Sequence, residues 1–109
     1  MLEVGANAES ASHNRITALH NAARNGYLDI CRLLLDWGAK VNSLDYWKET
    51  PLHDAARKGS LSVAKLLVER GVDVRVKNND GYTASDIARR RGYNAVAVWL
   101  DSVSVGKVR

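Results

Sequence analysis

Small and apolar residues gather in two short blocks on either side of Gly59, each with the spacing of a helix. The first block, LHDAARK, follows Thr50 and Pro51, which suit an N-cap and a first helical turn. The second block, SLSVAKLLVER, repeats apolar residues at helical intervals and stops at Gly71. The pattern predicts two short helices joined by a glycine turn.

The stretch after Gly71, VDVRVKNNDGY, alternates apolar and polar residues and then turns. Alternation with a period of two indicates an extended chain, and asparagine, aspartate and glycine favour a tight turn. These residues therefore predict an extended hairpin with its tip near residues 79–81.

This arrangement of two helices and a hairpin recurs every 33 residues. The positions that keep the register are Thr17, Thr50 and Thr83; Ala22, Ala55 and Ala88; Gly26, Gly59 and Gly92; Leu34, Leu67 and Leu100; and Gly5, Gly38 and Gly71. One such unit cannot bury its apolar face alone, so we expect successive units to stack on one another.

The unit that starts at Thr83 departs from the pattern by gaining polar residues. Ser85 stands where the earlier units have leucine, Arg89 where they have alanine, and Asp101 where they have leucine or valine. A terminal repeat needs a polar outer face because no further unit covers it. We therefore expect residues 83–101 to form a capping repeat.

The opening T-P-L-H-x-A-A, the internal glycine, the closing LL-x-x-G-A and the 33-residue period resemble the ankyrin repeat family over residues 2–101. The resemblance implies an all-α fold, an ankyrin-repeat solenoid of stacked helix–turn–helix units with projecting β-hairpin loops, and protein binding without catalysis. The segments it implies are residues 1–16, the tail and hairpin of a preceding truncated repeat; 17–49 and 50–82, two ankyrin repeats; 83–101, the C-terminal capping repeat; and 102–109, a flexible tail.

The first complete unit has no obvious cap on its N-terminal side, because no helix pair precedes Gly5. We expect the chain to be a fragment of a larger protein whose preceding repeat covers that face. The alternative is a cover supplied by another chain. The N-terminal side is then expected to be less stable than the middle of this chain.

Charge is distributed unevenly along the chain. The net charge of +4 divides into −2 over residues 1–56 and +6 over residues 57–109, and a basic half favours an acidic partner. No apolar run approaches the roughly 20 residues of a membrane span, and no secretory signal pattern is present. The single cysteine, Cys31, fits a reducing compartment, so we expect a cytoplasmic or nuclear location.

Residues suited to catalysis or metal binding are sparse. His20 and His53 lie one repeat apart, each three residues after a threonine, and the resemblance implies that this histidine makes hydrogen bonds near the turn. Cys31 aligns with Ala64 and Ala97, which indicates a small buried residue and no nucleophile. Zinc-ligand spacing and a phosphate-binding glycine loop are both missing. We therefore expect no enzyme, no catalytic or metal-binding residue, no cofactor and no small-molecule substrate.

The candidates for partner binding lie at first-helix ends and hairpin tips. They are Arg24, Arg57 and Arg90 in one register, the neighbouring Lys58 and Arg91, and the tip residues Tyr46, Trp47, Glu49 and Tyr82. Exposed aromatic residues beside arginine are typical of binding hot spots. We expect this concave face to bind an acidic, partly apolar segment of a protein partner, with Trp47 and Arg57 largely exposed. The alternatives are that the arginines stabilise helix C-termini and that the tip aromatics pack on the next hairpin.

Two other functions stay open. The basic half, with its RRR run at residues 89–91, could contact nucleic acid, although no nucleic-acid-binding motif is present. Tyr46, Trp47 and Glu49 could form part of an aromatic cage for methyl-lysine in a histone peptide, although the surrounding positive charge disfavours a cationic ligand. A steep loss of binding with salt would indicate the first function, and binding to a methylated-peptide array the second.

Overall fold

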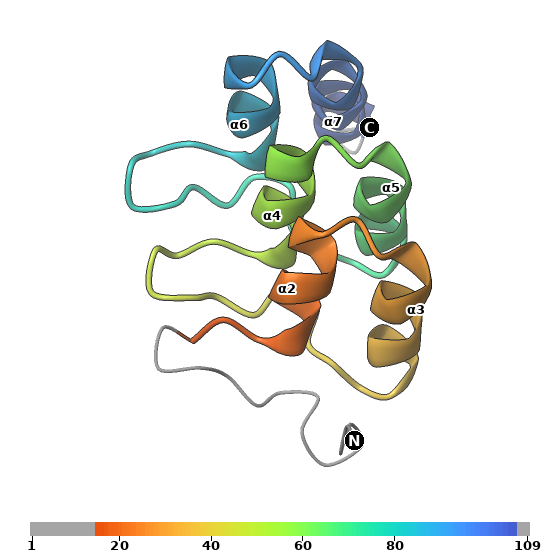
Figure 1. Cartoon of the computed structure of the whole chain (residues 1–109). Helices are drawn as coiled ribbons and strands as arrows, with labels where there is room; N and C mark the ends of the chain where they lie inside the picture. Colours follow the sequence, from red (N-terminus) through yellow and green to blue (C-terminus); the bar gives the residue numbers. More distant parts are fainter. Residues whose placement is uncertain (1–14, 107–109) are drawn as a thin grey trace.

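Helices pair and stack in the computed structural model, which describes residues 15–106 (Figure 1). The pairs are α2 (Ala18–Arg24) with α3 (Leu28–Asp36), α4 (Pro51–Lys58) with α5 (Leu61–Glu69), and α6 (Ala84–Arg90) with α7 (Asn94–Gly106). Helices α2, α4 and α6 form one layer, and α3, α5 and α7 form a second (Figure 1). The described residues form no strand, so the expected all-helical fold is confirmed.

The loops after α3 and α5 project past the first layer and keep the outline of hairpins without a β-ladder (Figure 1). In the first loop the Asp45 N–H donates to the Glu49 carbonyl at 3.1 Å. In the second loop the Asn78 N–H donates to the Tyr82 carbonyl at 2.9 Å. The expected hairpins are therefore present as closed turns, held by local hydrogen bonds.

A threonine caps the first helix of each pair. The hydroxyls of Thr17, Thr50 and Thr83 accept backbone N–H groups of the first turn, and the third helical residue accepts the threonine N–H in return. That residue is a histidine in the first two units and Asp86 in the third. These capping boxes satisfy N–H groups that a helix leaves unpaired at its start.

The two histidines also tie each first helix to the loop that follows. Nδ1 of His20 accepts the Thr17 N–H at 3.2 Å, so Nε2 carries the proton and donates to the Glu49 carbonyl at 2.8 Å. His53 repeats the arrangement with the Tyr82 carbonyl at 3.1 Å. Burial lowers the pKa of both imidazoles below its ordinary value. The prediction that these histidines make hydrogen bonds near the turn is confirmed.

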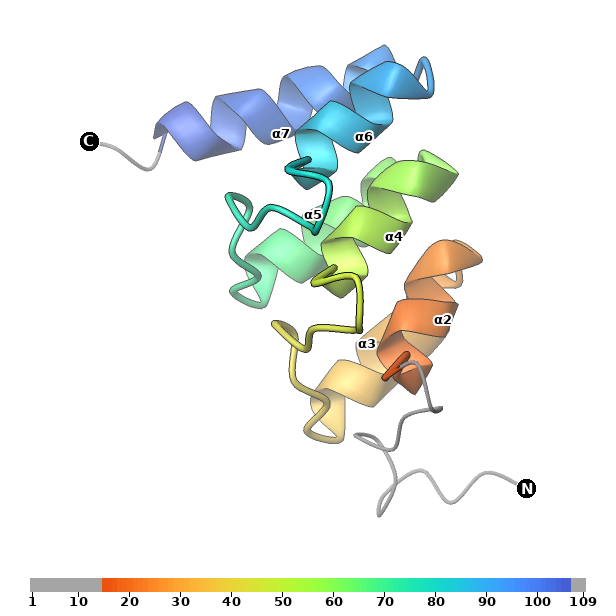
Figure 2. The same cartoon turned by 90° about the vertical axis from the view of Figure 1, so that its left-hand side faces the viewer.

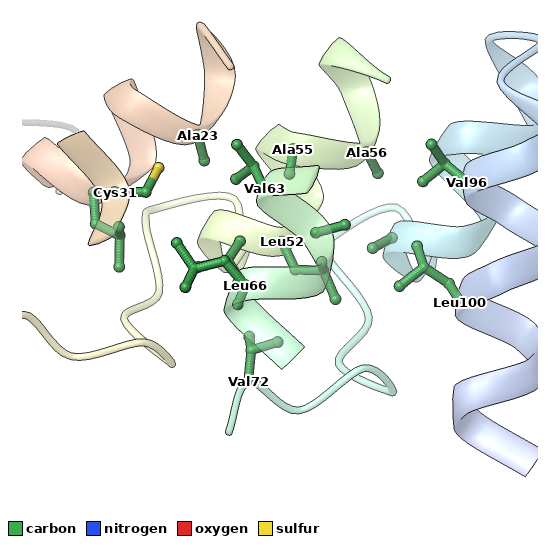
Figure 3. Close-up of a cluster of buried hydrophobic side chains, with 14 of the residues drawn as sticks. Ala23, Cys31, Leu52, Ala55, Ala56, Val63, Leu66, Val72, Val96 and Leu100 are labelled. Carbon is green, nitrogen blue, oxygen red and sulfur yellow. The ribbon is translucent and has the colours of Figure 1, made fainter. Parts of the chain in front are cut away.

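The core runs continuously along the stack, through buried alanine and aliphatic side chains. Figure 3 shows it from Ala23 and Cys31 at one end, through the middle helix pair, to Val96 and Leu100 at the other. Alanines on the first helices let neighbouring helices approach closely, and burying one leucine such as Leu67 is worth about 1.5–3 kcal/mol. Burial raises the pKa of the Cys31 thiol to about 11, which keeps it neutral, as a core residue should be.

Three polar residues of the third unit meet on α6 and α7. The Ser85 hydroxyl donates to the Asp101 carboxylate at 2.5 Å, and the Arg89 guanidinium pairs with the same carboxylate. Leucine, valine and alanine hold these positions in the other repeats. The three polar residues that replace apolar ones in this unit therefore satisfy one another's hydrogen-bonding groups.

Helix α7 continues to Gly106, so the prediction of a flexible tail from residue 102 is wrong for residues 102–106. Neither glycine nor proline interrupts residues 94–105, and the Ser102 hydroxyl donates to the Trp99 carbonyl at 2.7 Å. Residues 107–109 lie outside the described residues, as does the expected tail of a preceding repeat except for its last two positions.

Candidate protein-binding face

One side of the molecule combines the loop tips 45–49 and 78–82 with the exposed sides of α2, α4 and α6 (Figure 2). We call this surface the loop-side face. The nine residues expected to bind a partner all belong to these two tips or to the C-terminal ends of these three helices.

Asp45 builds the tip that carries Tyr46 and Trp47. Its side chain is buried, and its Oδ1 accepts the N–H groups of Trp47 and Glu49, both at 2.9 Å. Lys48 completes the turn with a left-handed φ of 62°. Because the backbone turns around the buried carboxylate, both aromatic side chains remain exposed.

Asn78 builds the next tip in the same way. Its buried Oδ1 accepts the N–H groups of Asp80 at 2.9 Å and of Tyr82 at 3.0 Å. We did not predict this role for Asp45 or Asn78. Their 33-residue spacing is the signal that could have revealed it.

The two tips are joined through the backbone of the aromatic pair. Asn79 donates its N–H to the Trp47 carbonyl at 2.9 Å and its side-chain amide to the Tyr46 carbonyl at 3.0 Å. The Arg15 guanidinium lies 5.9 Å from the centroid of the Tyr46 ring. The rings are therefore presented on a tip whose backbone is fixed by its neighbour.

Glu49 and Arg57 form a largely buried ion pair behind the tips. Arg57 donates to the two carboxylate oxygens at 3.0 and 2.8 Å, and the Asn78 amide donates at 2.8 Å. Burial opposes ionisation of Glu49, but these hydrogen bonds and the arginine charge outweigh it and lower the pKa of Glu49. The hydrogen bond from Glu49 likewise raises the pKa of Arg57. The Arg57 side chain is only 34% exposed, so the expectation that it is largely exposed is wrong.

Asp54 lies fully buried between two arginines. Its Oδ1 is 3.6 Å from Nε of Arg24 and 3.3 Å from Nη1 of Arg57. Its Oδ2 is buried without a hydrogen-bond partner in the part of the chain that the structure describes. Burial raises the pKa of Asp54 to about 7, against the opposing effect of the two arginine charges. Arg24 and Arg57 therefore face an internal carboxyl group, which leaves less of their charge for a partner.

Arg90 and Arg91 have no carboxylate partner among residues 15–106. The Arg90 guanidinium lies 4.7 Å from the centroid of the Tyr82 ring, and Nε of Arg91 donates to the Arg57 carbonyl at 3.2 Å. Both side chains border a depression of about 230 Å³ that Ile87 lines as well. The repeat pattern did not indicate Ile87 as a residue of this surface, because the corresponding residues of the other repeats are polar.

The structure brings five of the nine predicted residues around this depression. They are Glu49, Arg57, Tyr82, Arg90 and Arg91. Tyr46 and Trp47 lie on the neighbouring tip. Arg24, at the end of α2, faces Asp54 of α4. The stem of Lys58 lies against Gly26, at the end of the helices.

Within residues 15–106 no group of three histidine, cysteine or acidic side chains is arranged to hold a metal ion. No helix in the same range is long and apolar enough to cross a membrane. The histidines and Cys31 serve the capping boxes and the core, as described above.

The family model for ankyrin repeats (three copies) matches residues 1–78 and 43–105 of this chain. Together these matches span nearly the whole sequence, and the stacked helix pairs follow the same period. The chain belongs to the ankyrin repeat family. A search of curated proteins found no match. Ankyrin repeats are in general protein–protein interaction modules and are typically non-catalytic.

Proposed function

We propose that the loop-side face binds an extended, acidic and partly apolar segment of a partner protein. The observation that carries this proposal is the placement of Arg90 and Arg91, two exposed cations without a carboxylate partner within residues 15–106, beside a depression whose lining includes Tyr82 and Ile87. A guanidinium group binds carboxylates with directed, charge-assisted hydrogen bonds. An acidic side chain beside an apolar one matches this arrangement.

The same segment reaches the exposed Tyr46 and Trp47 on the neighbouring tip. Large rigid aromatic side chains lose little conformational entropy when they are covered, and they dominate many protein interfaces. The hydrogen bonds from Asn79 hold this tip beside the next one before any partner arrives. Trp47→Ala is therefore expected to cost about 2 kcal/mol of binding free energy.

Arg57 and Glu49 serve this face by positioning. Glu49 holds Arg57, and Arg57 in turn supports Arg91 through its backbone carbonyl. Arg57→Glu would place a third carboxylate beside Glu49 and Asp54, and breaking such a pair costs about 3 kcal/mol of folding stability. A loss of binding in that variant would therefore not distinguish unfolding of the domain from the loss of a contact with the partner.

The two alternative functions have less support. Nucleic-acid binding needs many free cations, whereas Arg24 and Arg57 face Asp54 and Glu49. A methyl-lysine cage needs an accessible carboxylate beside its aromatic rings, whereas that of Glu49 is buried and hydrogen-bonded.

Selection of a displayed peptide library on the folded chain tests the proposal. We expect the enriched peptides to be acidic with apolar residues between the carboxylates. Fluorescence anisotropy of one such peptide should show that Arg90→Glu weakens binding about ten-fold at low salt and less at high salt.

The matched control is Arg32→Glu, which makes the same charge change on α3, in the other helix layer. Its affinity should stay within about two-fold of the parent. Basic enriched peptides, or equal binding by both variants and the parent, would contradict the proposal. Tight binding of single-stranded DNA with a steep salt dependence would favour the nucleic-acid alternative.

A further inference from the structure

The second loop tip carries a charged side chain that the contacts described so far do not use. Asp80 borders the same depression of about 230 Å³ as Arg90 and Arg91. It is exposed, and it forms no ion pair with a lysine or arginine in the part of the chain that the structure describes. Glu49 and Arg57, which also line the depression, neutralise each other. The charges left for a partner are therefore two cations and one anion, and not cations alone.

One turn, used twice, places Asp80 beside Trp47. The Asp80 N–H donates to Oδ1 of Asn78 at 2.9 Å. The Trp47 N–H donates to Oδ1 of Asp45 at 2.9 Å, one repeat earlier. Because both tips use this turn, the Cα–Cβ bonds of Trp47 and Asp80 leave their tips in the same direction. The Asn79 N–H donates to the Trp47 carbonyl and holds the tips together, so the exposed ring and the carboxylate are neighbours on the loop-side face.

A carboxylate beside an exposed aromatic ring is suited to a cation. The ring attracts a cation that lies over its face, and the carboxylate pairs with the same group. A guanidinium group does both best, because it is flat enough to stack on the ring and presents two parallel N–H groups to the carboxylate. A segment with acidic residues alone would bring one of its carboxylates toward Asp80, and like charges in contact oppose binding.

We propose that Asp80 determines specificity on this face by selecting a partner segment with a basic residue, arginine in preference to lysine, two residues from the acidic residue that binds Arg90 and Arg91. This selection rests on the proposed function, because the segment must already lie across the loop-side face. The spacing follows from an extended chain, in which alternate side chains point to the same side and lie roughly 7 Å apart. The segment stays acidic overall and carries one cation at a defined place.

Asp80→Ser tests this selection without disturbing the tip. The hydrogen bond to Asn78 comes from the backbone N–H of residue 80, and serine is common in turns, so the fold should be retained. Circular dichroism checks this. A displayed peptide library selected on the parent should be enriched in arginine or lysine two positions from aspartate or glutamate. Selection on Asp80→Ser should keep the acidic residue and lose the enrichment of the basic one.

Two synthetic peptides then isolate the contact. One is a peptide selected on the parent, and the other has glutamine in place of its basic residue. Asp80→Ser should weaken the first about three- to five-fold at low salt, as measured by fluorescence anisotropy, because an exposed ion pair is lost. It should not weaken the second, which has no cation to pair with Asp80.

The matched control is Asp29→Ser, which makes the same charge change on α3, in the other helix layer. The Asp29 side chain is 98% exposed, so both peptides should bind this variant within about two-fold of the parent.

Two results would overturn the role of Asp80 and leave the proposed function in place. One is selection of acidic peptides without a basic residue at this spacing, alike on the parent and on Asp80→Ser. The other is an equal effect of Asp80→Ser on both synthetic peptides, because a contact with the basic residue must depend on that residue. Binding that Arg90→Glu leaves unchanged would overturn the proposed function, and the role of Asp80 with it.

Discussion

The first repeat (residues 17–49) and the middle repeat (residues 50–82) share one residue pattern but differ in how much of it they bury. Leu66 packs between helices of two repeats, while Leu33 at the same position is half exposed. The pattern determines which side chains can be buried, because it sets the face of the helix on which they lie. The neighbours in the stack determine which of them are buried.

The first helices of the two repeats differ in the same way. Asp54 of the middle repeat is enclosed by Arg24 from one repeat and Arg57 from its own, whereas its counterpart Asn21 is exposed. A carboxyl group becomes a buried, perturbed group only where a neighbouring unit closes over it. Equivalent substitutions in the two repeats should therefore differ in their effect on the free energy of unfolding and on its pH dependence.

The largest expected difference comes from one substitution made at both positions. Leu66→Ala should lower the free energy of unfolding by about 3 kcal/mol, because it leaves a cavity in a closed core. Leu33→Ala should cost less than about 1 kcal/mol, because half of that side chain is already in water. Urea unfolding followed by circular dichroism measures both. Equal losses would show that α3 is as well covered as α5.

Much of this architecture could be predicted from the sequence, because it depends on residues close along the chain. The capping threonines, the glycines that end helices and the 33-residue period are local features. The pairing of Arg57 with Glu49 could not be predicted in this way. It depends on Glu49, which lies in a loop eight residues earlier, and on Asn78 in the next loop, which hydrogen-bonds to Glu49. Glu49 holds Arg57, although the repeat register alone suggested that this arginine was free to bind a partner.

The second expected difference concerns pH. The pKa of Asp54 is about 7 in the folded protein against 3.8 in the unfolded chain, so the stability that its protonated form contributes is fully present below pH 3.8 and is lost as pH rises from there through about 7. Asp54→Asn cannot ionise. The free energy of unfolding of Asp54→Asn, relative to that of the parent, should therefore rise by roughly 2 kcal/mol between pH 5 and pH 8.

The matched control is Asn21→Asp in the first repeat. Its carboxyl group would be exposed and ionised across this whole range, so the difference from the parent should not depend on pH. The lowered pKa values of His20 and His53 make both proteins less stable below about pH 6.5, and this effect cancels in the comparison. A flat difference for Asp54→Asn would show that the buried carboxyl is ionised throughout.

Hydrogen exchange should give a third, smaller difference between the repeats. Amides of residues 18–36 are expected to exchange about ten-fold faster than those of residues 51–69, because Ile30 and Leu33 on α3 are about half exposed, whereas their counterparts on α5 are buried. Native-state exchange followed by mass spectrometry of peptides resolves the two ranges. Better protection of residues 18–36 would reverse the order of stability that the burial of α3 and α5 indicates.

The smallest expected difference lies in the two loop tips. Lys48 and Gly81 occupy the same repeat position with left-handed φ values of 62° and 85°. This conformation costs a residue with a Cβ atom about 1–2 kcal/mol, of which glycine returns about 0.5–1 kcal/mol through its greater freedom in the unfolded chain. Lys48→Gly should therefore stabilise the protein by about 0.5 kcal/mol, and Gly81→Lys should destabilise it by a similar amount. Urea unfolding of both variants tests this pair. Opposite signs are the required result, because the two tips are built on the same turn around Asp45 and Asn78.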